Sequence, residues 1–527
     1  MNSQRRNPWI GMAVISISLI IISLDNTVVN VALPSISRGL NASASELQWI
    51  VDAYILVFAA LLLTMGSIGD RLGRKRALQF GVAWFGVFSL MAALSTSVGM
   101  LIAARALLGF GGAIIMPATL SLITASFLDH KQRAQAIAVW AAVFGLGLGL
   151  GPLVGGFLLE HYKWSSVFYI NVPISVVAIL AGHFFLDDSK DDQARAPDVP
   201  GVVLSITGLF SLVFGIIQAG SDGWGATHVL VAFGAAAVLL SIFFWWERRA
   251  PNAMLPMFLF RNMSFTGANL AISLMMFGIL GVMFFFTQFF QSVQNYTALQ
   301  AGIRLFPTFL LIMFASANSP RVAKRVGIKL VVGVGFLIAA GGMFYLSQFS
   351  DAGASYGTIV PGLLLMGFGM GAAMSPATDS IMGSVPVHKA GVGSAMNDTT
   401  REVGGALGIA ILGTLMNHRY LHGVTGLKAA LPAQVFEAVR GSIQGAHAVA
   451  GPIGGAAGDA IIRTSNHAFV TGMTEAMVIA SVIMTGAAVF SLIFLPAETR
   501  CIEVECLEEE ARGAGGEIGM PMPASGD

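Results

Sequence analysis

The sequence predicts an all-α polytopic membrane protein, and three observations support that fold class. The 527 residues are 55% hydrophobic and only 11% charged, whereas a soluble domain is about 25% charged. The mean hydropathy is +0.76. The apolar residues gather in runs of about 20, the length that a helix needs to cross about 30 Å of hydrocarbon. Barrel strands would be only about 10 residues long, so we expect helices.

Fourteen apolar runs are long enough to span a membrane. Two longer polar breaks group them as six, two and six, an arrangement that suits two six-helix bundles rocking about a central site. The expected spans cover residues 9–33, 47–66, 77–97, 101–125, 136–158, 164–186, 200–218, 227–247, 265–290, 300–319, 328–348, 357–377, 403–420 and 473–495. The expected units are an N-terminal bundle at 1–186, a two-span insert with flanking cytoplasmic loops at 187–262, a C-terminal bundle at 263–498 with a long outer loop at about 420–470, and a cytoplasmic tail at 499–527.

Basic residues orient the chain. Most of the 29 Lys and Arg fall at the two ends or in every second loop, and cytoplasmic loops favour Lys and Arg. We therefore expect both termini in the cytoplasm and a multi-pass protein of the cell (inner or plasma) membrane. The first apolar run has no small-residue cleavage site before a polar sequence, so it is interpreted as a retained span. Cys501 and Cys506 are interpreted as free thiols in the tail.

Three charged residues fall within the expected spans: Asp25, Asp52 and Arg105. Such residues cost about 2.5–3.5 kcal/mol on insertion scales and mark functional sites. Counting the helix rise places all three in one layer in the outer third of the membrane. We expect one carboxylate to pair with Arg105. Because burial favours the protonated carboxyl and a nearby cation the ionised one, the layer is a candidate proton-coupling site, with Asp25 as primary carrier and Asp52 second. The alternative is a purely structural ion pair.

A glycine-rich basic loop, GSIGDRLGRKR at Gly66 to Arg76, follows the second expected span. Gly69 and Gly73 are expected to permit close backbone approach and a tight turn. Asp70 is expected to pair with a neighbouring cation or helix end. The alternative is a plain basic anchor on the cytoplasmic side. The candidate residues of this loop are Gly66, Gly69, Asp70, Arg71, Gly73, Arg74, Lys75 and Arg76.

The fifth expected span carries a second glycine motif, GLGLGLGPLVGG. Gly147, Gly151 and Gly155 recur every four residues, so they share one helix face and let another helix pack closely. Pro152 can bend the helix because it removes a backbone donor, and Gly156 ends the motif. Ordinary small-residue packing is the alternative interpretation.

These motifs resemble the major facilitator superfamily. The loop after the second span is similar to its motif A, RALLGFGGA in the fourth span to motif B, and the glycines of the fifth span to motif C, the antiporter signature. LDNTVVNVALP in the first span and FYINVP in the sixth resemble the 14-span drug:proton antiporter family, the QacA/EmrB-like multidrug efflux transporters. The resemblance implies a major-facilitator fold, a conformational gating role for the loop, and antiport.

The ninth expected span offers candidate substrate-lining residues. Its run MMFGILGVMFFFTQFFQ is rich in Met and Phe, which are adaptable surfaces for apolar ligands and organic cations. Phe285, Gln288 and Gln291 are the candidates, and lipid-facing Phe is the alternative. Asp379, Asp398 and Glu402 lie near the inner ends of two later spans, where we expect interfacial salt bridges.

The leading hypothesis is a secondary transporter that exports amphiphilic, cationic drugs or toxic compounds in exchange for protons. A narrow-range exporter of one metabolite, antibiotic, peptide or lipid is the alternative. The expected partners are the lipid bilayer, small amphiphilic substrates and protons, and the chain is interpreted as a monomer. No HExxH or phosphate-loop motif is present, so we expect neither an enzyme nor an ATP-driven pump, and no cofactor or metal. A net charge of +1 indicates no nucleic-acid partner.

Overall fold

A computed structural model describes residues 7–498 except 41, 43, 128, 190–197, 251–252, 254, 256 and 387–388. The expected tail at 499–527, with both cysteines, lies outside the described residues. Within those residues the regular structure is entirely helical, as the composition predicted. Because a bilayer offers no hydrogen-bond partners, a helix that satisfies its own backbone is the natural spanning element.

The first half of the chain forms six spanning elements, the sixth of which is broken. Short side-chain caps start two of them: Ser97 accepts a hydrogen bond from Met100 N, and Asp129 accepts one from Gln132 N. Gly73, at φ 107°, lies between the second and third helices. The helices are α1 (Pro8–Leu40), α2 (Ala44–Leu72), α3 (Arg74–Ala93), α4 (Val98–Ser126), α5 (His130–His161), α6 (Ser166–Tyr169) and α7 (Asn171–Phe185).

Two helices follow, α8 (Val199–Asp222) and α9 (Thr227–Glu247). Asp198 fastens the start of α8 to the end of α9, because its Oδ1 accepts hydrogen bonds from Gly201 N and from the Trp246 indole. The pair packs against the rest of the bundle mainly through α8, which contacts both α2 and a later helix, α14 (Ala390–Val424).

The second half begins with the short turn η1 (Met257–Arg261) and α10 (Met263–Gln288), which ends in a π-helical turn, η2 (Phe289–Val293). Four more long helices and the last span follow, with a hairpin of short helices between α14 and α17. They are α11 (Ala298–Val326), α12 (Ile328–Phe349), α13 (Tyr356–Gly383), α14, η4 (Thr425–Ala429), α15 (Ala433–Gly441), α16 (Ile443–Ile453) and α17 (Gly455–Phe494).

Thirteen helices of the described chain are long and apolar enough to cross a membrane, counting α6 with α7. The thirteenth expected span, 403–420, corresponds to α14, which is long enough but carries Asp398, Arg401 and Glu402 in its first half. The helix begins at Ala390, well before the expected boundary at 403, and residues of its polar first half are buried. Likewise, α17 begins at Gly455, well before the expected span 473–495.

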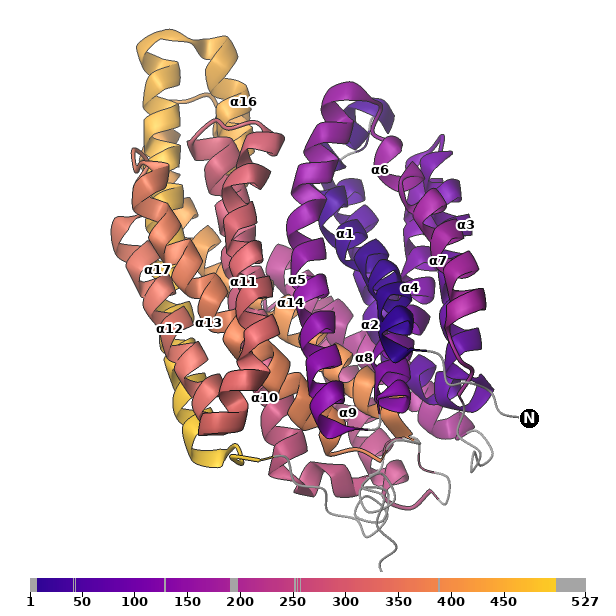
Figure 1. Ribbon diagram of the computed structural model, residues 1–527. Coiled ribbons are helices and arrows are strands. Elements are labelled where there is room, and N and C mark those ends of the chain that lie inside the picture. The colour runs from indigo at the N-terminus through magenta and orange to yellow at the C-terminus, as the bar shows by residue number, and fades with distance from the viewer. Residues whose placement is uncertain are drawn as a thin grey trace, which may run out of the picture.

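Figure 1 shows the two halves side by side, with the start of α1 and the end of α17 at the same end of the bundle. We call this end the terminus face and the opposite end, which carries α15 and α16, the hairpin face. Two helix pairs hold the halves together: α5 packs along α11, and α2 packs along α14. Apart from the candidates on α10 and η2 and Asp379 on α13, the residues singled out in the sequence lie on the helices of these two seams or inside the first half.

Candidate functional site

A buried ion pair lies at the centre of the first half. Asp25 on α1 is 0% exposed and its Oδ2 accepts a hydrogen bond from Arg105 Nη1 on α4, at 2.5 Å. Its other oxygen accepts one from Asn171 Nδ2 at the start of α7, at 3.1 Å. Arg105 Nε is bound to the carbonyl oxygen of Ile50 on α2, at 2.9 Å. Four helices therefore converge on one carboxylate.

Neighbouring groups fix the geometry of the pair. Asn171 also donates to Ser89 Oγ at 3.0 Å, and Ser89 donates to the Phe168 carbonyl. The guanidinium of Arg105 lies 4.4 Å from the ring centroid of Tyr54. The hydroxyl of Tyr54 is buried and makes no hydrogen bond among the described residues, and Tyr54 lies within electrostatic range of Glu402 on α14. The pair is thus linked through Tyr54 toward the second half.

Asp52 lies two residues after Ile50 on α2, is half-buried and makes an interaction of its own. Arg105 is bound to Asp25. The structure thus brings two of the three expected proton-coupling residues into contact.

The loop between α2 and α3 joins the two halves at the terminus face. Asp70 is buried and accepts hydrogen bonds from Arg74 Nε at 2.8 Å and from Ser121 Oγ at 3.1 Å. Its second oxygen accepts the backbone N–H of Gly391, in the first turn of α14, at 2.7 Å. A carboxylate at a helix N-terminus is favoured by the unpaired N–H groups and by the helix dipole.

The rest of the loop is fastened within the first half. Lys75 Nζ donates to the carbonyl oxygens of His183 and Leu186 at the end of α7, and Arg76 pairs with Asp188 at 3.2 Å. Arg71 is half-buried. Among the glycines of this loop, Gly66 lies closest to the backbone of α14.

A methyl group at Gly66 would lie 3.0 Å from the carbonyl carbon of Gly391, whereas one at Gly69 would meet only Ala77 at an ordinary 3.6 Å. The expected close approach at Gly69 is therefore wrong. Gly73 does make the tight turn, because φ 107° disfavours residues with a side chain.

The glycines of α5 serve two neighbours. Gly147, Gly151 and Gly155 face Ser23, Thr27 and Val28 of α1. Gly145, Gly149 and Gly156 face Ile312, Phe309 and Leu299 of α11 across the seam, and Gly302 of α11 approaches Pro152. All six glycines belong to the sequence motif, but the spacing of four residues predicted only the face toward α1, because the face toward α11 depends on a contact between the halves.

The three candidate lining residues at the end of α10 and in η2 lie in different surroundings. Phe285 is 0% exposed whereas its neighbour Phe284 is 41% exposed, so the lipid-facing alternative is wrong for Phe285. Gln288 accepts a hydrogen bond from Gln444 of α16 at 3.2 Å, which ties α10 to the hairpin. Gln291 is half-buried in the π-helical turn.

A second buried charge cluster was not expected from the sequence. Asp398 is 1% and Arg401 3% exposed, on α14, so the expectation of an interfacial salt bridge at Asp398 is wrong. Asp398 instead accepts hydrogen bonds from Asn397 and Ser394. The guanidinium of Arg401 lies over Trp140 and Phe144 of α5, 4.8 and 5.2 Å from the ring centroids. The string NDTTRE gave the only signal, because its charges lie within one helical turn of each other.

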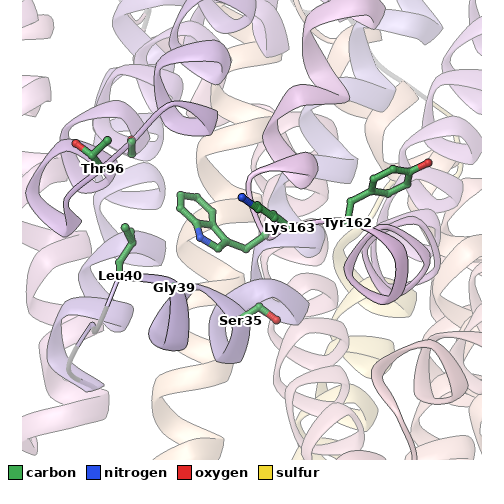
Figure 2. A pocket seen from close by; sticks show the side chains of 8 residues that line it. Ser35, Gly39, Leu40, Thr96, Tyr162 and Lys163 are labelled. Carbon is green, nitrogen blue, oxygen red and sulfur yellow. The ribbon is translucent and has the colours of Figure 1, made fainter.

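Two cavities open at the ends of the bundle, away from these clusters. One of about 670 Å³ at the hairpin face is lined by the end of α1, the α3–α4 connection and the segment Tyr162–Trp164 (Figure 2). The other, of about 450 Å³, lies at the terminus face between the ends of α11 and α17 and includes Lys324, Arg325 and Asp379. Within the described residues, no group of three or more His, Cys, Asp or Glu side chains is placed to hold a metal.

Comparison with known proteins identifies the family of the chain. The family model of the Major Facilitator Superfamily matches residues 15–409. The chain belongs to the major facilitator superfamily. A member of known structure, the proton:xylose symporter XylE, has a TM-score of 0.62 at 14% identity and covers 95% of this chain and 98% of its own. The human organic anion transporter MFSD10 has a TM-score of 0.57, also at 14% identity, over 92% and 100%. These two show the fold.

Relatives within the superfamily are more similar in sequence. The multidrug efflux pump LfrA of Mycolicibacterium smegmatis is 36% identical over 91% of this chain and 95% of its own. The tetracenomycin C resistance and export protein of Streptomyces glaucescens is 31% identical over 94% and 93%. The methyl viologen resistance protein SmvA of Salmonella typhimurium is 32% identical over 89% and 94%. The superfamily and the many apolar helices identify a multi-pass membrane transporter.

Proposed function

We propose that the chain exports amphiphilic, cationic drugs or toxic compounds in exchange for protons. Three relatives that cover most of the chain are named for drug export or resistance, and one of them, methyl viologen resistance protein, is named for a compound that carries positive charge. The observation that carries the proton-coupled part is the buried pair of Asp25 and Arg105.

A carboxylate in this setting can exchange one cation for another. When Asp25 is ionised, Arg105 balances it, and when a proton neutralises the acid, the arginine charge becomes available to repel a cation. Removing one partner of a buried pair leaves the other uncompensated, at about 3–5 kcal/mol, so a proton arriving at Asp25 must change the surroundings of Arg105. That change is the coupling step of the proposal, and Asp52 is the second acid on the same route.

The seams carry the conformational part of the proposal. The terminus face is taken as cytoplasmic, with the chain in the cell membrane and both ends inside. The bond from Asp70 to the first turn of α14 holds the halves together on that side, and the glycine faces of α5 let α1 and α11 slide closely past it. Phe285, Gln288 and Gln291 are the proposed lining residues on α10.

Transport in proteoliposomes tests this function. Purified protein is reconstituted with ethidium, a pH gradient is imposed, and dye movement is measured for wild type, Asp25→Asn and Glu160→Gln. Glu160 is an exposed acid near the end of α5 and serves as the matched control. We expect gradient-driven movement in wild type and in Glu160→Gln and none in Asp25→Asn. Equal rates in the Asp25 variant would overturn the assignment of Asp25, and no gradient dependence in wild type would overturn proton coupling.

A narrow-range exporter is the second candidate, and a specific observation favours it. The relatives include the puromycin resistance protein of Streptomyces alboniger and the methylenomycin A resistance protein of Streptomyces coelicolor, each named for one antibiotic, at 34% and 30% identity. Survival of a sensitive host on a panel of unrelated cations and antibiotics separates the two. Protection against one compound alone would favour the narrow exporter.

A membrane sensor that does not transport is a further alternative, and proton release on addition of substrate to the purified protein would distinguish a carrier from such a sensor.

A further inference from the structure

Arg401 is a buried charge that makes no ion pair among the described residues, although two acids lie on its own helix. Its one hydrogen bond is from Nη2 to Thr378 Oγ1, at 3.2 Å. Its Nε and Nη1 make no hydrogen bond within the part of the chain that the structure describes. Asp398 lies one turn before it and Glu402 beside it, and both interact with it only at longer range. Residues three apart are neighbours on a helix surface, so a closer pair with Asp398 is within reach.

The guanidinium instead lies on aromatic rings of the other half. Trp140 and Phe144 stack on one another, with centroids 5.9 Å apart and planes at 9°, and both are buried. Trp140 is fixed by the hydrogen bond from its indole to Thr119, at 3.0 Å. Such faces attract cations, most strongly when water is excluded. The contact joins α5 of the first half to α14 of the second.

The contact lies at the interface of the halves, well inside the two helices that form it. Arg401 and Trp140 each lie about 15 Å along their helices from the ends of α14 and α5 at the terminus face. Carriers built from repeated bundles bind their substrates near the bilayer midplane, at the interface of the halves. The ring pair therefore stands where a cationic substrate would meet both halves, and Arg401 fills it.

We propose that Trp140 and Phe144 form the binding face for a flat or aryl-substituted organic cation, and that Arg401 occupies this face as a tethered competitor. A ligand that takes the rings displaces the guanidinium, which then pairs with Asp398 and Glu402 and satisfies its unpaired N–H groups. The displaced guanidinium thus gains acidic partners, and these lower the free-energy cost of replacing it on the rings with the ligand. The inference rests on the proposed function for the ligand class and names its site.

Direct binding to the purified full chain in lipid nanodiscs tests the proposal without a proton gradient. The probes are tetraphenylphosphonium and tetraphenylborate, which share a shape and differ in the sign of charge. For wild type we expect tetraphenylphosphonium to bind and tetraphenylborate to bind much more weakly. Arg401→Gln removes the competitor and should tighten tetraphenylphosphonium binding by up to about 30-fold, because a buried cation–π contact contributes about 2 kcal/mol and about 1.4 kcal/mol corresponds to a tenfold change in affinity. Arg401→Lys keeps the charge and should bind as wild type does.

Variants of the aromatic rings should change the affinity in the opposite direction to Arg401→Gln. Trp140→Leu should weaken tetraphenylphosphonium binding about tenfold, and Trp140→Phe, which keeps a ring, should lose less. Trp245→Leu is the matched control, because Trp245 carries a cation–π contact with Arg249 at 4.3 Å on the exposed side of α9. Loss of packing at Trp140 alone could weaken binding, but it would not make Arg401→Gln bind more tightly.

Unchanged or weaker binding by Arg401→Gln overturns the proposal, as does wild-type affinity in Trp140→Leu. If Trp140→Leu does not fold, Trp140→Phe and Arg401→Gln decide the question. The predicted binding pattern without gradient-driven transport would leave this site standing and overturn the proposed proton coupling. If transport is driven by the gradient but the Arg401 and Trp140 variants bind tetraphenylphosphonium as wild type does, the proposed proton coupling stands and this site is overturned.

Discussion

The backbone N–H of Gly391 donates a hydrogen bond of 2.7 Å to the carboxylate of Asp70, and this bond joins the α2–α3 loop to the first turn of α14. The two residues come from different halves of the protein. Hydrogen bonds to charged groups contribute about 1.5–3 kcal/mol, so this one is strong enough to bias an equilibrium between states that are open and closed at the terminus face.

Asp70→Asn is expected to shift that equilibrium toward the open state. The variant keeps the shape of the side chain but loses the charge that faces Arg74 and the helix end. The measurement is maleimide labelling of Ala395→Cys, which lies beside Gly66 on the seam, in protein whose tail cysteines are serines. Labelling from the terminus face should quicken about tenfold and transport should fall. Asp188→Asn, which breaks an exposed pair with Arg76, is the control. Equal labelling rates in the two variants would contradict the proposal that the bond between Asp70 and Gly391 holds the terminus face closed.

Gly151→Ala is expected to impair transport by overpacking α5 against α1. The added methyl would lie 2.8 Å from Thr27 Cβ and closer still to its hydroxyl, and inserted volume costs about 1–3 kcal/mol. Thr27→Gly in the same chain should restore part of the transport rate, since it removes the atoms in the way. Gly413→Ala, in α14 with open space around it, is the matched control. No recovery in the double variant would show that Gly151 acts through something other than this contact.

Arg105→Gln is expected to destabilise the protein by about 3–5 kcal/mol, because it leaves the Asp25 charge buried without its partner. The double variant Asp25→Asn, Arg105→Gln should recover most of that stability, since an amide pair can hydrogen-bond without net charge. Gradient-driven transport should stay absent in the double variant. Thermal unfolding in detergent and dye transport are the two measurements. Recovery of transport together with stability would reduce the pair to a structural role.

Phe285→Leu is expected to change the relative rates for different substrates, and Phe284→Leu is not. The two residues are adjacent on α10, but Phe285 is buried and Phe284 is exposed, so the second variant controls for the loss of an aromatic ring in a membrane helix. The measurement is efflux of a panel of compounds, each rate divided by the amount of protein in the membrane. The same profile for wild type and Phe285→Leu would remove Phe285 from the proposed lining.

Much of the fold follows from local properties of the sequence. Span length, the side of each loop and the glycine face of α5 depend on residues within about 20 positions of each other, and hydropathy and helix periodicity report on those. Prediction from these local properties failed at α14. Asp398 and Arg401 lower the hydropathy of their segment, so its first three turns resembled a loop, although other helices cover them.

The sequence by itself determined that this chain is a membrane transporter of a known superfamily and that Asp25 and Arg105 are charges within spans that need partners. Only the tertiary structure decided that Asp70 is buried and which partners the buried charges have: Asn171 beside the Asp25–Arg105 pair, Gly391 for Asp70, and Trp140 for Arg401. The physical reason is that a charge in a low-dielectric interior must be compensated, which composition reveals, whereas the compensating group is set by contacts between helices that lie hundreds of residues apart in the chain.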